Sequence, residues 1–113
     1  MPVVSAGTAG HYVWGDGCDG WHLVASDRLS VIQERMPPNA AEKPHYHERA
    51  EQFFFILSGV ATMEIDGEMF TIHPHHGIHV KPGTPHRISN RQRSDLVFTV
   101  TSTPPSHGDR VDI

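Results

Sequence analysis

The chain has 113 residues, of which 37 % are hydrophobic and 19 % are charged, and its net charge is −4. This size and composition suit one globular domain, and an acidic chain without a basic block argues against a nucleic-acid partner. The one cysteine, Cys18, excludes an internal disulfide. The start lacks the features of a signal peptide and no apolar run is long enough to span a membrane, so we expect a cytoplasmic protein.

Short segments rich in β-branched and aromatic residues predict strands, separated by breaks that contain proline, glycine or asparagine. In chain order, the expected strands are 21–26, 29–36, 52–59, 60–66, 68–73, 77–81, 86–90 and 96–102. The segment GDGCDG at 15–20 is interpreted as a loop, and Asp66-Gly67 predicts a two-residue hairpin turn. Many short strands and no helical period of about 3.6 residues predict an all-β sandwich or barrel.

Two histidines stand out in the stretch KPHYHERAEQ, where His45 and His47 lie two positions apart. Residues i and i+2 of a strand face the same side, so both side chains would project together. Further on, His86 follows a Pro-Gly turn and offers a third nitrogen for a divalent ion. The His-x-His pattern alone is also compatible with exposed or hydrogen-bonded histidines.

The wider spacing resembles the two motifs of the cupin family. The first motif, G-x5-H-x-H-x3,4-E-x6-G, is matched by Asn39, His45, His47, Gln52 and Gly59, with Asn39 in place of the first glycine. The second motif, G-x5-P-x-G-x2-H-x3-N, is matched at Gly83, His86 and Asn90, whereas His75 and Lys81 replace its first glycine and its proline.

The resemblance covers about residues 29–101. It implies a single-domain cupin double-stranded β-helix, or jelly-roll barrel, with a metal held inside one end. We take 1–113 as one domain with a core over about 21–102, and 1–12 and 103–113 as arms that are flexible or form an interface.

The resemblance further implies that the metal ligands are His45, His47, His86 and the residue at the family's acid position. Counting back from Gly59 places that position at Gln52, whereas counting forward from His47 also permits Glu51. We favour Gln52 because the distance to the glycine sets the strand register, and because some small cupins, including ones acting on unsaturated uronates, use glutamine here.

Four neutral ligands would leave the ion its full double charge. This favours Lewis-acid chemistry and the capture of an anionic substrate. The expected cofactor is one divalent ion, whose identity among Ni, Zn, Mn, Fe and Co is not decided by nitrogen and oxygen ligands.

Glu34 is a candidate catalytic base. It shares a strand face with Ile32 and Met36, so its carboxylate either points into the barrel or is paired at an edge. Arg35 and Glu42 are expected at the surface.

Two further polar regions have two interpretations each. The histidines of the stretch 73–79 are expected to form a surface cluster in a turn, with a second metal site as the alternative. The tail 102–110 contains His107 and ends with Arg110; it is expected to be solvated, with closure over the pocket mouth or contact with a partner subunit as the alternative.

Residues Phe53, Phe55 and Leu57 make the second face of the strand 52–59 apolar as well. A small barrel does not cover its own outside, so we expect a homodimer that packs on this face.

The favoured function is a metal-dependent enzyme acting on a small polar molecule of sugar or hydroxy/keto acid type, by isomerisation, ring opening or dioxygenation. The alternative is a non-catalytic module that binds or senses a small ligand, with a structural metal or none.

Overall fold

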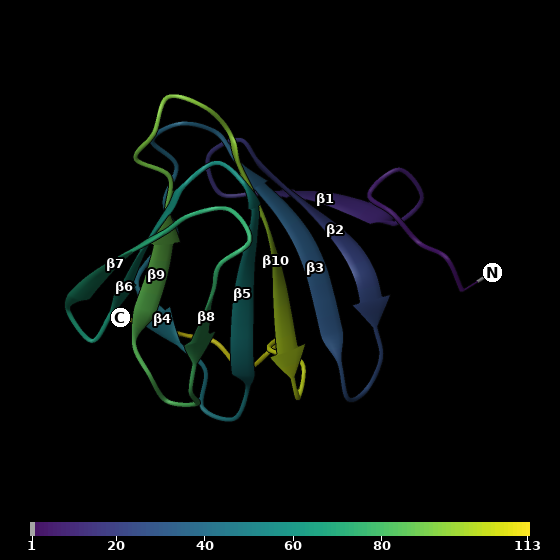
Figure 1. Ribbon diagram of the computed structural model, residues 1–113. Helices are drawn as coiled ribbons and strands as arrows, with labels where there is room; N and C mark the ends of the chain where they lie inside the picture. The colour runs from purple at the N-terminus through teal and green to yellow at the C-terminus, as the bar shows by residue number, and fades with distance from the viewer. Residues whose placement is uncertain (1) are drawn as a thin grey trace.

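A computed structural model describes residues 2–113, which form two facing antiparallel sheets (Figure 1). The first sheet has the strand order β1-β2-β3-β10-β5-β8 and the second has the order β11-β4-β9-β6-β7. The strands are β1 (Gly10–Trp14), β2 (Cys18–Ala25), β3 (Ser30–Met36), β4 (His45–Tyr46), β5 (Glu51–Ser58), β6 (Ala61–Ile65), β7 (Glu68–Ile72), β8 (Gly77–Val80), β9 (His86–Ser89), β10 (Leu96–Thr103) and β11 (Val111–Asp112). The predicted all-β fold class is therefore confirmed.

The core lies between the two sheets because the central strands alternate buried and less buried residues. In β10, Leu96, Phe98 and Val100 are buried while the residues between them are partly exposed. In β5, Phe54 and Ile56 face the same interior. Each such side chain stabilises the fold by about 1.5–3 kcal/mol relative to exposure. The opposite sheet completes the core with Ala61, Met63, Ile72 and Ile88.

Two turns explain how neighbouring strands are joined. Asp66 and Gly67 both have positive φ angles, of 50° and 81°, and connect β6 to β7 with Ile65 opposite Glu68. Positive φ at both central positions is the geometry that suits the twist of a hairpin, so the predicted turn is confirmed. Gly59, after β5, also has a positive φ, and a Cβ there would lie 2.5 Å from the Asp95 carbonyl oxygen.

Every expected strand overlaps a strand of the structure, but three regions differ from expectation. The segment 15–20 is not a loop throughout, because Cys18 to Gly20 begin β2 and pair with β1. Both expected arms contain strands: β1 starts at Gly10, and β11 pairs with β4. The pairing of β11 with β4 joins residues far apart in the chain, whereas β1 and β2 form a local hairpin around residues 15–17 that the sequence analysis did not predict. No helix in the described residues is long and apolar enough to cross a membrane.

Candidate metal centre

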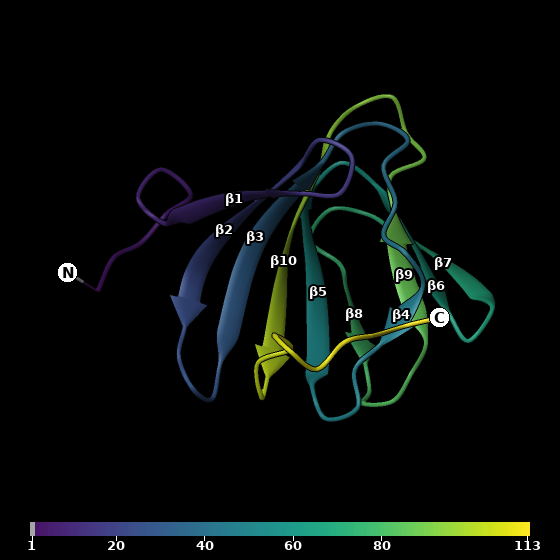
Figure 2. The ribbon, with the colours of Figure 1, turned by 180° about the vertical axis from the view of Figure 1, so that it is seen from behind.

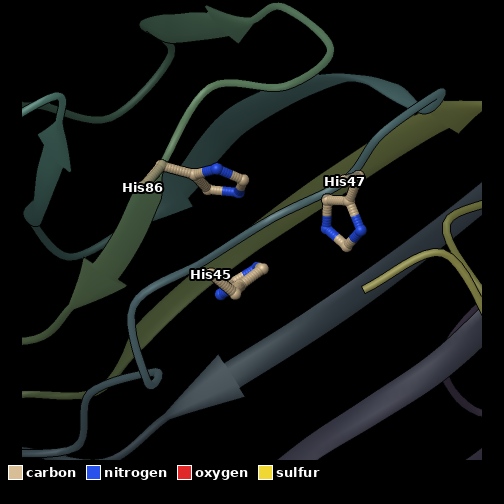
Figure 3. A group of neighbouring side chains, drawn as sticks. All are labelled: His45, His47 and His86. Atoms are coloured by element: carbon tan, nitrogen blue, oxygen red, sulfur yellow. The ribbon is translucent and has the colours of Figure 1, made fainter. Parts of the chain in front are cut away.

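Three histidines converge at one end of the barrel (Figure 3). His45 lies on β4 directly opposite His86, the first residue of β9, and His47 follows β4. One nitrogen of each ring lies within 4.8 Å of the others. All three residues are buried, with exposed fractions of 2 %, 6 % and 3 % for His45, His47 and His86. The spacing predicted from the sequence therefore places these three side chains together.

Each of the three rings is oriented by a backbone carbonyl. The Nδ1 atoms of His45, His47 and His86 lie 2.7, 2.8 and 2.8 Å from the carbonyl oxygens of Lys43, Asp109 and Thr84, respectively. A carbonyl oxygen only accepts, so each Nδ1 donates and the lone pair of each ring resides on Nε2. The buried Nε2 of His86 has no hydrogen-bond partner among residues 2–113, and a metal ion would satisfy it.

Gln52 lies on the inner face of β5 and is 6 % exposed. Its Nε2 donates to the Ser102 hydroxyl at 3.0 Å, while its buried Oε1 has no partner. A buried amide oxygen without a partner is unfavourable, and a cation is one group that would satisfy it. Oxygen and imidazole donors together fit a divalent transition metal.

Glu51, the alternative to Gln52, lies on the opposite face of the strand. Its side chain is 51 % exposed, and its Oε2 lies 2.5 Å from Nε2 of His79 on the neighbouring β8. Because the side chains of a strand alternate, Gln52 faces the barrel interior and Glu51 faces outward.

Burial favours the neutral form of His45 and His86, which is the form that metal binding requires. Removal from water lowers the pKa of His45 to about 4, against the opposing effect of its bond to Lys43. Burial also lowers the pKa of His86 below its usual value. Both rings are therefore neutral at pH 7 without any need to lose a proton on metal binding.

A cavity of about 770 Å³ adjoins the proposed ligands and opens to solvent. Glu34, which the sequence left open between the interior and an edge, lines this cavity and is 9 % exposed, and burial raises its pKa well above the usual value. The expectation that Glu42 lies at the surface is wrong: it lines the cavity, its Oε1 accepts from the Ile88 N–H at 3.1 Å, and burial raises its pKa. The reason is that the segment before β4 runs beside β9.

The C-terminal tail also lines this cavity, contrary to the expected solvated tail. Figure 2 shows it running from the end of β10 to β4. His107 and Arg110 are at the cavity wall, and Asp109 supplies the carbonyl that orients His47. Sequence reasoning missed Asp109, because nothing local connects it with a histidine 62 positions away.

The surface histidines do not join this group. His73, His75, His76 and His79 are all exposed, and within residues 2–113 the one group of potential ligands within reach of a common ion is the buried trio. This agrees with a surface cluster.

The profile of the Cupin domain family matches residues 32–102. The match covers more than half of the chain, so the protein belongs to the cupin family. An uncharacterized protein of Methanocaldococcus jannaschii is 32 % identical over 83 residues, which make up 73 % of this chain and 66 % of the relative. The chain thus spans about two thirds of the length of the curated relative that it matches.

Solved structures support the same fold. A Thermotoga maritima protein described as a predicted oxalate decarboxylase superposes with a TM-score of 0.83 at 19 % identity, over 89 % of this chain and 97 % of that one. KdgF from Halomonas sp. superposes with a TM-score of 0.80 at 18 % identity, over 88 % and 91 % of the two chains. These likenesses establish the cupin double-stranded β-helix and leave the reaction to be argued from the site.

Proposed function

We propose that this cupin is a metal-dependent enzyme that acts on a small polar molecule of the sugar or hydroxy/keto acid type. The observation that carries the proposal is a pair of buried atoms without a partner in residues 2–113, Nε2 of His86 and Oε1 of Gln52, beside a cavity that is open to solvent. In the proposal His45, His47, Gln52 and His86 hold one divalent ion, among Ni, Zn, Mn, Fe and Co. The cavity beside them leaves room for a substrate, which a purely structural ion would not need.

The ligand set supports Lewis-acid chemistry, since all four proposed ligands are neutral. When bound, the ion would polarise a carbonyl or enediol oxygen or acidify a bound water. We favour isomerisation or ring opening over dioxygenation for this reason.

In the proposed reaction Glu34 transfers the proton. It lies on the cavity wall, and its raised pKa means that the carboxyl keeps a proton to a higher pH than an ordinary glutamate does. A carboxyl of this kind suits a general acid-base role near neutral pH. With a substrate in hand, Glu34→Gln should lower kcat by about 100- to 10,000-fold while the metal content stays unchanged.

The test of the site is the metal content of tag-free protein, measured by elemental analysis. We expect about one ion per chain in the wild type, and a loss in His47→Ala and in Gln52→Ala. Glu51→Ala is the matched control, because the neighbouring residue faces outward and its removal should leave the metal content unchanged. Oxygen uptake and turnover of sugar acids would then be assayed with the metal found. A wild type that takes up no metal under any loading condition would contradict the enzyme proposal and leave a barrel that only binds a ligand.

The proposal includes a homodimer. Phe53 is 44 % exposed on the outer face of β5, where its ring stacks with Phe55 at a centroid distance of 6.2 Å. Exposed aromatic surface of this kind supports packing against a second copy. Sedimentation velocity should give a dimer for the wild type and a weaker dimer for Phe53→Ser, and a monomeric wild type would contradict this part.

A further inference from the structure

The C-terminal tail is held firmly against the barrel. The carboxylate of Asp109 accepts hydrogen bonds from the backbone N–H groups of Glu48, Arg49 and Ala50, at 3.0, 3.0 and 2.9 Å. Beyond it, β11 pairs with β4, and the N–H of Ile113 donates to the Pro44 carbonyl at 3.0 Å. One side chain thus satisfies three consecutive donors of the turn between β4 and β5, so the tail has a defined position.

The same residue joins the tail to the candidate metal centre. The Asp109 carbonyl accepts from Nδ1 of His47, while its carboxylate binds the turn that follows His47. These contacts fix the position of the next residue, Arg110, which therefore lies at the cavity beside the proposed metal ligands.

Arg110 lines the cavity wall with 41 % of its side chain exposed. Within residues 2–113 its guanidinium makes one hydrogen bond, from Nε to Asp112 Oδ1 at 2.7 Å, and no ion pair with Glu34 or Glu42. An exposed pair between residues two positions apart stabilises a fold little. The terminal nitrogens of Arg110 thus remain available for a ligand at the cavity mouth.

The charge of Arg110 reaches groups on both sides of the cavity. Burial raises the pKa values of Glu34 and Glu42, and the charge of Arg110 opposes that rise. Three acids line the cavity, Asp27, Glu34 and Glu42, and within residues 2–113 Arg110 forms an ion pair with none of them. Its charge is therefore not neutralised by an acid inside the cavity.

We propose that Arg110 is a substrate-binding residue that takes a carboxylate group, so that the substrate is a small carboxylate such as a sugar acid or a hydroxy or keto acid. A guanidinium presents paired N–H donors that match the two oxygens of a carboxylate. The rest of the substrate then extends toward His45, His47 and Glu34. This inference rests on the proposed function and makes the substrate class specific.

The test is calorimetric titration of metal-loaded, tag-free protein with two matched pairs of probes. D-Galacturonate is compared with D-galactose, and lactate with lactamide, because each pair differs in the carboxylate alone. We expect the wild type to bind at least one carboxylate probe about 10-fold or more tightly than its neutral partner. Arg110→Gln should weaken that carboxylate by about 10- to 100-fold and leave the neutral probe unchanged, whereas Arg110→Lys should retain part of the preference.

Two controls separate this inference from the proposed function. Arg91→Gln removes an exposed arginine that does not line the cavity and should bind as the wild type does. Metal content is measured on the same samples, and the Arg110 variants should keep it. A wild type that holds no metal after loading would contradict the proposed function, whatever the Arg110 variants show. With normal metal content, any of three results would overturn the assignment of Arg110. The wild type could bind carboxylate and neutral probes with equal affinity, it could bind no carboxylate probe, or Arg110→Gln could keep the preference of the wild type.

Discussion

The inside and the outside of this barrel present the same residue types in opposite environments. Inside, His45, His47 and His86 are buried, and each ring is fixed by a backbone carbonyl. Outside, four more histidines are exposed and do not join the metal-binding group: His73, His75, His76 and His79. A candidate metal site is therefore distinguished from a surface cluster by the burial and the fixed orientation of its rings, and not by the number of histidines.

The acidic residues repeat this contrast. Glu34 and Glu51 both lie on long strands of the same sheet, yet Glu34 lines the cavity and Glu51 pairs with His79 on the outer face. Burial raises the pKa of Glu34 well above its usual value, and perturbed carboxyls of this kind concentrate at functional sites.

The largest effect, on metal affinity, should appear when one histidine of the inner group and one of the outer group are each replaced by alanine. His86→Ala removes a proposed ligand from the interior and should weaken metal binding by at least about 100-fold. His76→Ala removes an exposed ring and should leave the affinity of the interior site unchanged. Metal titration of the two purified variants, with Zn or Ni as the probe, measures both. Loss of affinity in His76→Ala with none in His86→Ala would contradict the interior site and assign metal binding to the surface cluster.

The next largest effect concerns two glycines of the β1–β2 ribbon. Gly20 lies opposite Tyr12 on one side and Glu34 on the other, and a Cβ there would overlap the Tyr12 ring. Gly20→Ala should therefore destabilise the fold by about 1–3 kcal/mol and displace Tyr12 from the cavity wall. Gly10→Ala, at a position with open space, should change stability by less than about 0.5 kcal/mol. Denaturant unfolding of both variants decides whether the two positions differ.

Replacing Glu34 tests the inner carboxyl through the pH dependence of stability. Because its folded-state pKa is raised above the usual 4.5, the folded protein binds more protons than the unfolded chain above that pH, and stability falls as pH rises through this window. Glu34→Gln should reduce this slope, and its stability relative to the wild type should increase as the pH rises from 4.5 to 7. Part of the slope should remain, because the pKa of Glu42 is raised as well. A steeper slope in Glu34→Gln would show that the carboxyl is ionised and paired.

The smallest effect should come from the outer pair of Glu51 and His79. Both side chains are about half exposed, at 51 % and 48 %, so water screens their attraction. A double-mutant cycle with Glu51→Gln and His79→Gln should give a coupling below about 0.5 kcal/mol at physiological salt. If the coupling energy between Glu51 and His79 were as large as the change in stability caused by Glu34→Gln, the inner and outer carboxyl groups would not differ as described.

The strand positions were largely predictable from local pattern, and the proposed ligands were predictable from the resemblance to the cupin motifs. The Asp66-Gly67 turn and the alternation in β5 and β10 depend on residues a few positions apart. The cupin spacing identified His45, His47 and His86 as candidates, because the distances within a motif depend on the lengths of the strands and turns between its residues. Local alternation left Gln52 and Glu51 open, since both faces of β5 carry apolar residues.

The all-β class, the cupin spacing and the three histidines could therefore be read from the amino-acid sequence. The inward direction of Gln52, the place of Glu42 at the cavity and the wall formed by the tail became known from the folded chain. These features depend on residues that lie far apart in the sequence. The contacts of Asp109 with the turn after His47 join residues about 60 positions apart, and such contacts follow from the packing of the whole barrel rather than from any local pattern.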